Sequence, residues 1–382
     1  MRCRTVFKSR LKLTSTPRAQ VAILAVNLRY WPELLELCDG LQVVVIETQR
    51  APLRISRLRR ILQLWRSDYT TLGFAAAAAE LEASGAKVLV AIDQSFEAIH
   101  QLGQLLPVVP QVLVAHGSIR NENIKRAGIM HRDHRLLAVW GEQDVLAYSE
   151  SCEVPVQCIP IGSLRNAVYL KSRTAPPTAE SRHPLLFVSQ YSGKRETLDE
   201  GNPDRLRTLN LTKRHLARYC RERSIPLRIA LRPAVSGDLM PDLHEEEKQH
   251  YFQVFESVKI SFSDPSVRYS TYWESDCADV TIGVPAGSLT ESFARGNKVL
   301  MIRQNPISGS YYGFPLDGIW LLTEPTYQEF AQRLDTLREI DLETWANVST
   351  DARCQMIQDG ESDRAFWLIR EIVLKFVSRS TT

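Results

Sequence analysis

The chain has 382 residues, of which 44% are hydrophobic and 24% are charged, and its formal net charge is +3. These values are typical of a globular protein, and the length suits two domains of about 150–200 residues. The near-neutral charge and the lack of a recognition motif argue against nucleic acid as a partner.

The cysteines and the hydrophobic runs bear on the compartment. The seven cysteines are scattered, form no CxxC pair and show no His/Cys spacing suited to zinc. Such a set predicts reduced thiols and a cytoplasmic chain. We expect no transmembrane segment, because no run of about 18 apolar residues exists. We also expect no secretory signal, because the N-terminus lacks a long apolar stretch.

The first half of the sequence alternates short apolar runs with helix-like stretches. The expected strands span residues 21–26, 42–47, 87–92, 111–115, 136–139 and 156–161. The expected helices span residues 30–38, 54–65, 72–84, 96–105 and 143–149. The helix over 72–84 is the clearest, because it contains five consecutive alanines and Gly85 follows it. This alternation predicts a parallel sheet in an α/β domain.

Residues 171–183 have the composition of a linker, with two prolines and many small polar residues. The pattern then restarts. The expected strands span residues 185–189, 227–231, 259–262, 278–282, 298–302 and 319–322. The expected helices span residues 209–223, 245–256, 269–275, 326–337 and 364–377, with one more starting at Ser288.

We therefore predict an α/β fold with two Rossmann-like domains that face each other across a cleft. The predicted divisions are a basic tail over residues 1–18, an N-terminal domain over 19–170, the linker over 171–183, a C-terminal domain over 184–362 and a last helix over 363–382.

Residues 276–301 form a predicted strand, turn, helix and strand. Ser288 precedes Glu291 by three residues, which is the spacing of a capping box. A helix N-terminus after a parallel strand also binds anions, commonly phosphate. Ser288 and Glu291 therefore either cap the helix only, or belong to a ligand site. In a ligand site, Ser288 and Thr290 offer hydroxyl groups and Glu291 could accept a hydrogen bond from a ribose or a base.

Open parallel sheets bind ligands beyond the carboxyl ends of their strands, so the residues after each strand are candidates. His116 follows the predicted strand 111–115, and Gly117 beside it would let the backbone pass close to a neighbour. A histidine there suits a general base, although a histidine held only by its turn is the alternative. Ser118 and Arg120 follow and could contact a polar substrate.

Two further strand ends in the second half carry polar or basic side chains. Ser192 and Lys194 follow the strand 185–189 and could hold a diphosphate, although the Walker spacing is absent. Arg232 follows the strand 227–231 and could meet a phosphate, with a surface arginine as the alternative. No DxD pair is set up to hold a metal, so we expect metal-independent chemistry. The absence of GxGxxG weakens a dinucleotide oxidoreductase interpretation.

Three segments resemble the GT-B glycosyltransferases, and most of all bacterial enzymes that build surface carbohydrate. These are capsule and lipopolysaccharide glycosyltransferases, including those that use activated Kdo, and CDP-glycerol glycerophosphotransferases. The segments are VLVAHGSIRNENIK (112–125), LRIALRP (227–233) and YSTYWESDCADVTIGVPAGSLTESFARGNKVL (269–300). The sequence departs from the family at Ala234, where a histidine is common, and at residues 286–290, which replace a tighter Ser-Thr turn.

The resemblance implies transfer of a sugar or a polyol phosphate from a nucleotide-activated donor, CMP-, CDP- or UDP-linked, without a further cofactor. The acceptor would be a surface polysaccharide or a glycolipid. His116 would deprotonate the acceptor hydroxyl, or alternatively bind the donor. The last helix would cross back onto the N-terminal domain. The nucleotide and its phosphates would contact Ser192, Lys194, Arg232, Ser288, Thr290 and Glu291, and the acceptor would lie near Gly117, Ser118 and Arg120.

The N-terminal region is basic, and the resemblance gives this feature a meaning. Residues 1–18 contain six Lys and Arg and no acid, and residues 50–66 contain a second cluster of arginines. Because acceptors in these pathways are often lipid-linked, this region could bind an anionic membrane surface, which would make the protein peripheral on the inner membrane. The apolar residues expected to face the lipid are Leu11, Leu13, Leu58, Ile61 and Trp65. A solvated basic face is the alternative.

Two other functions remain open at this point. A nucleotide-sugar 2-epimerase shares the two-domain fold, would act without an acceptor, and would need several acids and histidines that converge in the cleft. A non-catalytic binding protein of GT-B shape would not depend on His116 or Glu291.

Overall fold

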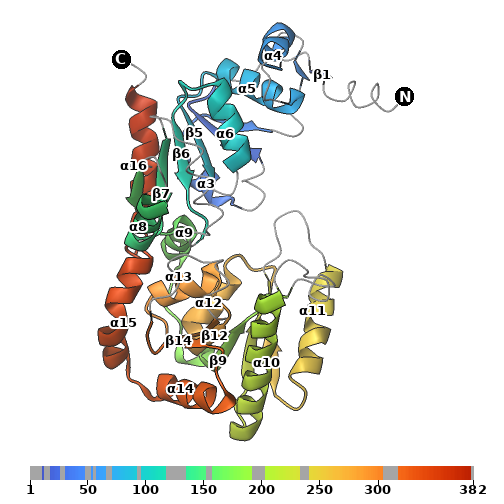
Figure 1. The fold of residues 1–382 in the computed structure, drawn as a ribbon, viewed down its shortest axis with the longest axis vertical. Coiled ribbons are helices and arrows are strands. Elements are labelled where there is room, and N and C mark those ends of the chain that lie inside the picture. The colour runs from blue at the N-terminus through green and yellow to red at the C-terminus, as the bar shows by residue number, and fades with distance from the viewer. Residues whose placement is uncertain are drawn as a thin grey trace.

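The computed structural model describes residues 11–12, 18–25, 31–47, 53–54, 57–65, 71–92, 96–117, 135–151, 157–191, 203–232, 241–303 and 317–379. Within these ranges the chain forms two six-stranded parallel sheets, each flanked by helices (Figure 1). A separate two-stranded pair joins β1 (Leu11–Lys12) to β4 (Leu53–Arg54). The predicted α/β class is confirmed, and each of the twelve strands of the two large sheets overlaps a predicted one.

The N-terminal sheet has the strand order β3-β2-β5-β6-β7-β8. Its strands are β2 (Val21–Leu24), β3 (Val43–Ile46), β5 (Val88–Ile92), β6 (Gln111–Val114), β7 (Arg135–Val139) and β8 (Cys158–Pro160). Its helices are α3 (Glu33–Leu37), α4 (Leu58–Trp65), α5 (Leu72–Ser84), α6 (Phe96–Leu105), α8 (Glu142–Ser151) and α9 (Leu164–Ser172). The chain runs from β2 to the edge strand β3 and then returns to β5 on the other side of β2, which makes β2 and β5 a topological switch point.

Helix α5 shows how closely local sequence determines this domain. Thr71 caps its N-terminus by accepting a hydrogen bond from the backbone N–H of Phe74. Gly85 ends it in the left-handed conformation, at φ 69°, which glycine adopts without a steric penalty. The five alanines over residues 75–79 are all buried against the sheet and the neighbouring helices, because their small side chains permit close packing. The predicted bounds of this helix are confirmed.

The C-terminal sheet has the strand order β11-β10-β9-β12-β13-β14. Its strands are β9 (His183–Val188), β10 (Leu227–Ala230), β11 (Ile260–Phe262), β12 (Ala278–Gly283), β13 (Val299–Arg303) and β14 (Leu321–Thr323). Its helices are α10 (Pro203–Arg223), α11 (Pro241–Val254), α12 (Ser270–Cys277), α13 (Gly287–Ala294), α14 (Tyr327–Glu339) and α15 (Leu342–Met356). This is the order of the doubly wound dinucleotide-binding fold, with its switch point between β9 and β12.

The last helix, α16 (Arg364–Arg379), crosses back onto the N-terminal domain, as predicted (Figure 1). Phe366, Ile369 and Val373 are buried in one cluster with apolar residues of β2, β5 and β6. Arg370 donates hydrogen bonds to the carbonyl oxygens of Leu37 and Asp39, each at 2.7 Å, and so fixes α16 to the end of α3.

Several sequence predictions about elements are wrong. The helix predicted over 54–65 begins only at Leu58, because Arg54 lies in β4. Helices α9 and α15 were not predicted at all.

The predicted domain divisions remain predictions. The linker predicted over 171–183 spans the end of α9, the 3-10 turn Ala179–Ser181 and the first residue of β9. Most of the predicted basic tail over 1–18 lies outside the described residues. In the part of the chain that is described, no helix has the length and apolarity needed to cross a bilayer.

Candidate functional site

A hydrogen bond joins the two strands at the switch point of the C-terminal sheet, just beyond their carboxyl ends. Gln190, just after β9, donates its side-chain amide to the carbonyl oxygen of Val284, just after β12, at 2.7 Å. Helix α13 starts three residues later, at Gly287. The first turn of α13 therefore lies at the edge where open α/β sheets bind ligands.

The predicted capping box at α13 is wrong. The cap residue is Ala286, which has no side-chain hydrogen bond to the helix, and Ser288 lies inside the first turn. Ser288 is only half-buried. Thr290 is buried, and its hydroxyl donates to the carbonyl oxygen of Ala286 at 3.1 Å. The carboxylate of Glu291 does not bend back to the cap but accepts hydrogen bonds from Ser163 and Tyr272. Backbone N–H groups in this turn consequently have no side-chain acceptor at the cap, a feature typical of helix ends that bind anions.

The carboxyl edges of the two sheets meet at α13. Ala115 and Trp140 follow β6 and β7 of the N-terminal sheet, yet they belong to the same buried apolar cluster as Val284 and Leu289 of the C-terminal domain. A Cβ on Gly287 would lie 3.4 Å from the Trp140 ring, so the start of α13 packs directly on the end of β7. The edge that carries His116 and the edge that carries α13 are therefore opposite walls of one junction.

His116 lies two residues beyond β6 and is half-buried. Its ring meets Trp31 edge-on, with ring centroids 6.4 Å apart. The guanidinium of Arg165 covers the face of Trp31 at 3.8 Å. Among the described residues, which end at Gly117 and resume at residue 135, a Cβ on Gly117 would meet nothing within 4 Å, so the close backbone approach at this glycine stays a prediction.

The remaining predicted site residues are less well defined. Arg232 follows β10 and is exposed, and its carbonyl oxygen lies 3.1 Å from Nε2 of His244. Ser118, Arg120, Ser192 and Lys194 lie outside the described residues. Ala115, next to His116, and Leu289, next to Ser288, belong to one buried cluster, and the roles of all the predicted site residues remain predictions.

A buried polar cluster surrounds Ser189 and Tyr191, which follow β9 directly. Ser189 contacts the hydroxyl of Tyr251 at 2.7 Å. Tyr191 packs on the ring of His250 with centroids 5.0 Å apart. Nε2 of His250 lies 3.0 Å from the buried ammonium of Lys213. Burial, reinforced by the charge of Lys213, lowers the pKa of His250 to about 4, so this ring is neutral at neutral pH and accepts a hydrogen bond from the ammonium.

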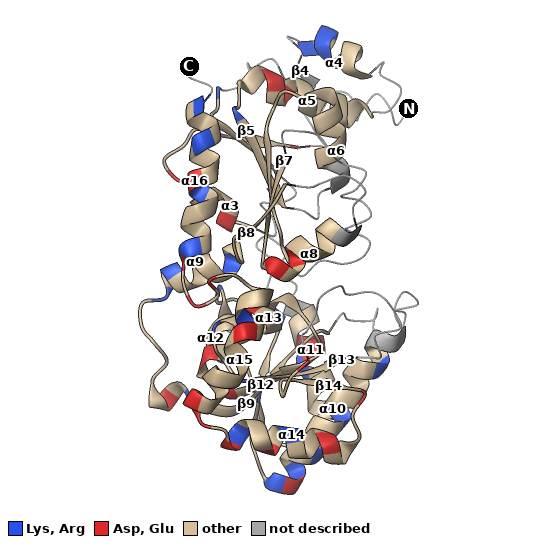
Figure 2. Ribbon diagram, turned by 60° about the vertical axis from the view of Figure 1, so that its left-hand side comes forward, with Lys and Arg blue, Asp and Glu red and all other residues tan. Residues whose placement is uncertain are grey.

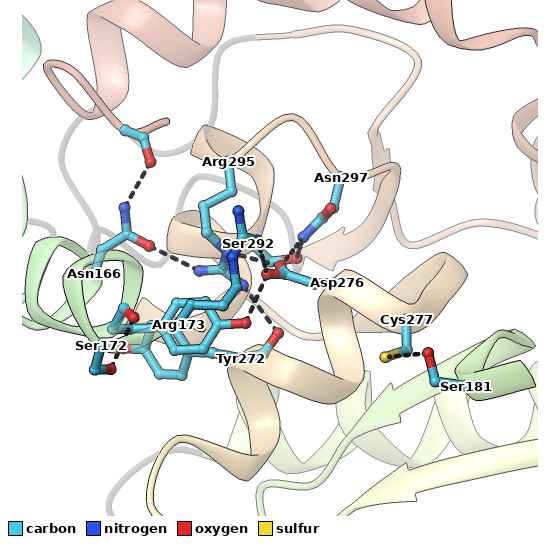
Figure 3. A network of polar contacts seen from close by, with 12 residues as sticks. Asn166, Ser172, Arg173, Ser181, Tyr272, Asp276, Cys277, Ser292, Arg295 and Asn297 are labelled. Atoms are coloured by element: carbon cyan, nitrogen blue, oxygen red, sulfur yellow. Dashed lines mark hydrogen bonds and ion pairs between the residues drawn. The ribbon is translucent and has the colours of Figure 1, made fainter. Parts of the chain in front are cut away.

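A second polar network joins the two domains along helix α9 (Figure 3). At its centre Asp276 of α12 accepts four hydrogen bonds. The donors are the hydroxyl of Tyr169 (2.7 Å), the guanidinium of Arg173 (3.0 Å), Nε of Arg295 (2.8 Å) and the amide of Asn297 (2.7 Å). Burial acts to raise the pKa of Asp276, but the Arg295 charge and these hydrogen bonds outweigh it and hold the pKa below its ordinary value.

The same network reaches the segment that leads into α16. Arg295 donates to the side-chain oxygen of Asn166 at 2.8 Å, and the amide of Asn166 donates to the carbonyl oxygen of Gly360 at 2.6 Å (Figure 3). A Cβ on Gly360 would lie 2.6 Å from Cβ of Ala294, so this segment packs closely against the end of α13. Helix α9, helix α13 and the crossing segment therefore form one contact region.

Glu291 is buried in this region, with 3% of its surface exposed. Its two carboxylate oxygens accept hydrogen bonds from the hydroxyl groups of Ser163 and Tyr272. Burial raises the pKa of Glu291 in spite of these two donors and the nearby guanidinium groups of Arg165 and Arg295. Glu291, which was predicted to bind the nucleotide, thus already has both carboxylate oxygens in hydrogen bonds inside the protein.

A third carboxylate of the junction is Glu33 of α3. It accepts from the hydroxyl of Tyr269 at 2.8 Å and lies 3.7 Å from Nε of Arg165. The rings of Tyr169, Tyr269 and Tyr272 pack on one another, with centroids 5.3–5.7 Å apart. Each of the three tyrosines therefore donates to a different carboxylate.

Most of this junction was not predicted, because helix α9 was not predicted. The sequence did contain a signal for this helix, because serine is a preferred N-cap residue. In the structure Ser163 is the N-cap and accepts a hydrogen bond from the backbone N–H of Asn166. The apolar residues Leu164, Ala167 and Val168 then follow at helical spacing. What the sequence could not indicate is that the polar face of this helix would meet a domain more than 100 residues away.

Metal binding finds no support in the ranges that the structure covers, where no three His, Cys, Asp or Glu side chains are grouped so that they could hold an ion. Metal-independent chemistry nevertheless remains a prediction from the sequence.

No family model matches the sequence, and no curated protein is similar enough to match it. Solved structures do match. UDP-GlcNAc 2-epimerase from Neisseria meningitidis, bound to UDP-GlcNAc, has a TM-score of 0.55 at 13% identity, over 93% of this chain and 99% of its own. MnaA from S. aureus, in a structure with UDP, has a TM-score of 0.58 at 11% identity, over 94% and 97%. Sucrose-phosphate synthase from Thermosynechococcus elongatus has a TM-score of 0.56 at 11% identity, over 95% and 100%.

At such identities the likeness concerns the fold alone. It extends over nearly the whole of this chain and of each similar chain. The chain therefore has the two-domain α/β architecture of GT-B type that the sequence predicted.

Proposed function

We propose that the protein is a glycosyltransferase that moves a sugar, or a polyol phosphate, from a nucleotide-activated donor to a surface-polysaccharide or glycolipid acceptor. The observation that supports this most is the meeting of two parallel sheets at their carboxyl edges, with the first turn of α13 opposite the end of β6. Two structures of similar fold contain UDP-GlcNAc or UDP. We therefore propose a UDP-linked donor first, with CMP- and CDP-linked donors as alternatives.

In this proposal the C-terminal domain binds the nucleotide and the N-terminal domain presents the acceptor. Backbone N–H groups of the first turn of α13 and the hydroxyl of Ser288 contact the donor phosphates, with Arg232 beside them. Ser192 and Lys194 are proposed on the phosphate side, and Gly117, Ser118 and Arg120 on the acceptor side.

The chemistry is then a displacement without a metal. His116 accepts the proton of the acceptor hydroxyl while that oxygen bonds to the anomeric carbon of a sugar donor, and the bond from this carbon to the phosphate oxygen breaks. For a polyol phosphate donor, the acceptor oxygen bonds to the phosphorus instead, and the phosphoanhydride bond to the nucleotide breaks. The negative charge that appears on the leaving nucleotide is stabilised by the N–H groups of α13 and by Arg232. In metal-dependent enzymes a bound metal ion has this role. The alternative role for His116 is to bind the donor.

The first test is a thermal-shift screen with UDP, CDP, CMP and GDP. A ligand that binds only the folded state increases the free energy of unfolding, by about 2.7 kcal/mol at 100 times its Kd, and so raises the melting temperature. We expect one nucleotide to respond, and a screen in which none responds would remove most of the support for the proposal.

The second test uses His116→Ala, with His215→Ala as the control because His215 lies on α10 behind the C-terminal sheet. Loss of general base catalysis should reduce turnover about 10²–10⁴-fold, with nucleotide binding unchanged. If nucleotide binds but neither the wild type nor the variants turn over any donor with glycan acceptors, the protein is a binding protein of GT-B shape.

A nucleotide-sugar 2-epimerase is the second candidate, because one of the similar structures is such an enzyme. The two functions differ in their need for an acceptor. Incubation of the protein with UDP-GlcNAc alone should leave the sugar unchanged for a transferase, whereas an epimerised product would favour the second candidate.

An anionic membrane surface is the proposed partner of helix α4. This helix lies at the end of the N-terminal domain away from the C-terminal domain (Figures 1 and 2). Leu58, Leu62 and Trp65 are 39%, 37% and 48% exposed and lie on one face at helical spacing. Ile61, which was predicted to face lipid, is buried instead. Residues 50–66 contain no acid, which suits an anionic surface.

Co-sedimentation with vesicles tests this surface. We expect binding to phosphatidylglycerol-containing vesicles, little binding to phosphatidylcholine alone, and a loss of binding in Trp65→Ala. The matched control is Trp367→Ala, since Trp367 on α16 is also about half exposed. Binding that is independent of anionic lipid, or equal in the two variants, would contradict the proposal.

A further inference from the structure

Helix α13 presents two different faces to the rest of the protein. Leu289 and Phe293 are fully buried in the core of the C-terminal domain. Gly287, Glu291 and Ala294 follow one another at helical spacing on another face. This second face meets the N-terminal domain and the crossing segment, because Gly287 packs on Trp140, Glu291 bonds Ser163, and Ala294 packs on Gly360.

Glu291 is the polar residue in the middle of that face. Its partner Ser163 is the N-cap of α9, a helix whose apolar side is buried with the strands of the N-terminal sheet. Its other partner, Tyr272, comes from α12 of the C-terminal domain and is buried. The carboxylate therefore joins three elements, α9, α12 and α13, and one of these belongs to the opposite domain.

Freeing this carboxylate for a ligand would be costly. A buried hydroxyl that loses its acceptor keeps the full cost of its removal from water, and two such hydroxyl groups depend on Glu291. The guanidinium groups of Arg165 and Arg295 face it from α9 and from the end of α13, and so also favour its present position. A ribose hydroxyl would have to offset all of these interactions.

We propose that Glu291 is a positioning residue, and not a ligand of the nucleotide. By joining Ser163 to Tyr272 it fixes the first turn of α13 relative to the wall of the N-terminal domain that carries His116. The inference rests on the proposed function, since it names the residue that sets the distance between the phosphate site and the general base. A displacement of about 1 Å between reacting groups can cost about 10²-fold in rate.

The variants are Glu291→Gln, Ser163→Ala and Tyr272→Phe. Each should lower kcat about 10- to 100-fold and leave the affinity for the donor nucleotide within about twofold of the wild type. All three should retain the wild-type preference for UDP over 2′-deoxy-UDP and 3′-deoxy-UDP. Because Ser163→Ala also removes a helix cap, Thr326→Ala is the matched control: Thr326 is the exposed N-cap of α14, far along the chain from the junction.

A ribose ligand gives the opposite pattern. If Glu291→Gln alone lost affinity and no longer distinguished UDP from its deoxy forms, while Ser163→Ala and Tyr272→Phe kept the wild-type kcat, the proposal would be wrong. Hydrogen exchange provides a readout that does not depend on the reaction. Glu291→Gln should speed exchange in both α9 and α13, and unchanged protection in α9 would also overturn the proposal. Failure of the wild type to bind any nucleotide would instead count against the proposed function.

Discussion

The Asp276–Arg295 pair is the part of the domain junction whose energy can be worked out most directly. Only 5% of the Asp276 side chain and 3% of the Arg295 side chain are exposed, and their atoms approach to 2.8 Å. Removal of one partner from a buried ion pair costs about 3–5 kcal/mol, because an uncompensated charge remains buried. In Asp276→Ala, Arg295 keeps its bonds to Asn166 and to the carbonyl oxygen of Tyr272, which places the cost at the lower end.

The other donors add to that cost. Tyr169 and Asn297 would each lose an acceptor in a partly buried position, at about 1 kcal/mol each. We therefore expect Asp276→Ala to lose about 5 kcal/mol, which corresponds to roughly 10–20 °C in melting temperature for a domain of 150–250 residues. Urea unfolding followed by tryptophan fluorescence, with differential scanning calorimetry, measures both quantities.

A double-mutant cycle and a pH series give the control. Asp276→Ala/Arg295→Met removes both charges, so it should be more stable than Asp276→Ala alone. Since the folded-state pKa of Asp276 is lowered, its contribution is complete above the ordinary value of 3.8 and is lost as pH falls through the folded-state value. A loss below about 1 kcal/mol at pH 7, or a double variant no more stable than Asp276→Ala, would refute this account of the junction.

Three further variants test other parts of the fold. Gly360→Ala places a Cβ 2.6 Å from Cβ of Ala294 and should cost about 1–3 kcal/mol by overpacking, measured by thermal unfolding. His250 has a folded-state pKa of about 4, below its ordinary 6.5, so stability should fall as pH decreases from 6.5 to 4, and His250→Asn should flatten this slope in urea titrations at each pH. Ile369→Ala should cost about 2–5 kcal/mol and expose α16 to limited proteolysis.

The sheets were predictable from the sequence because their signal is local. The central parallel strands are buried on both faces and therefore read as short apolar runs, such as 88–92 or 278–283. Even the number of strands in each large sheet follows from these runs. The errors occurred where a local signal is weak: α9 and α15 are amphipathic helices rich in polar residues, and residue 54 joins a two-stranded pair with a partner far along the chain.

The candidate site was less predictable, because the same local pattern admits two structures. Ser288 and Glu291 have the spacing of a capping box, yet Ala286 occupies the cap position and Glu291 turns toward the other domain. The spacing of three residues places both side chains on neighbouring faces of the first turn, but whether the carboxylate bends back to the cap or points outward depends on its partners. Those partners, Ser163 and Tyr272, lie 128 and 19 residues earlier in the chain.

The composition of the junction bears on how the two domains work together. Two apolar side chains, Ala115 and Trp140, join the cores of the two domains, whereas α9 meets α12 and α13 through tyrosines, carboxylates and guanidinium groups. Polar contacts depend on direction and therefore define one relative orientation, while an apolar contact alone would permit the domains to slide. Since donor and acceptor would bind on different domains in the proposed reaction, this orientation sets the geometry of transfer. A residue such as Asp276, which touches neither predicted substrate site, should consequently affect kcat as well as stability.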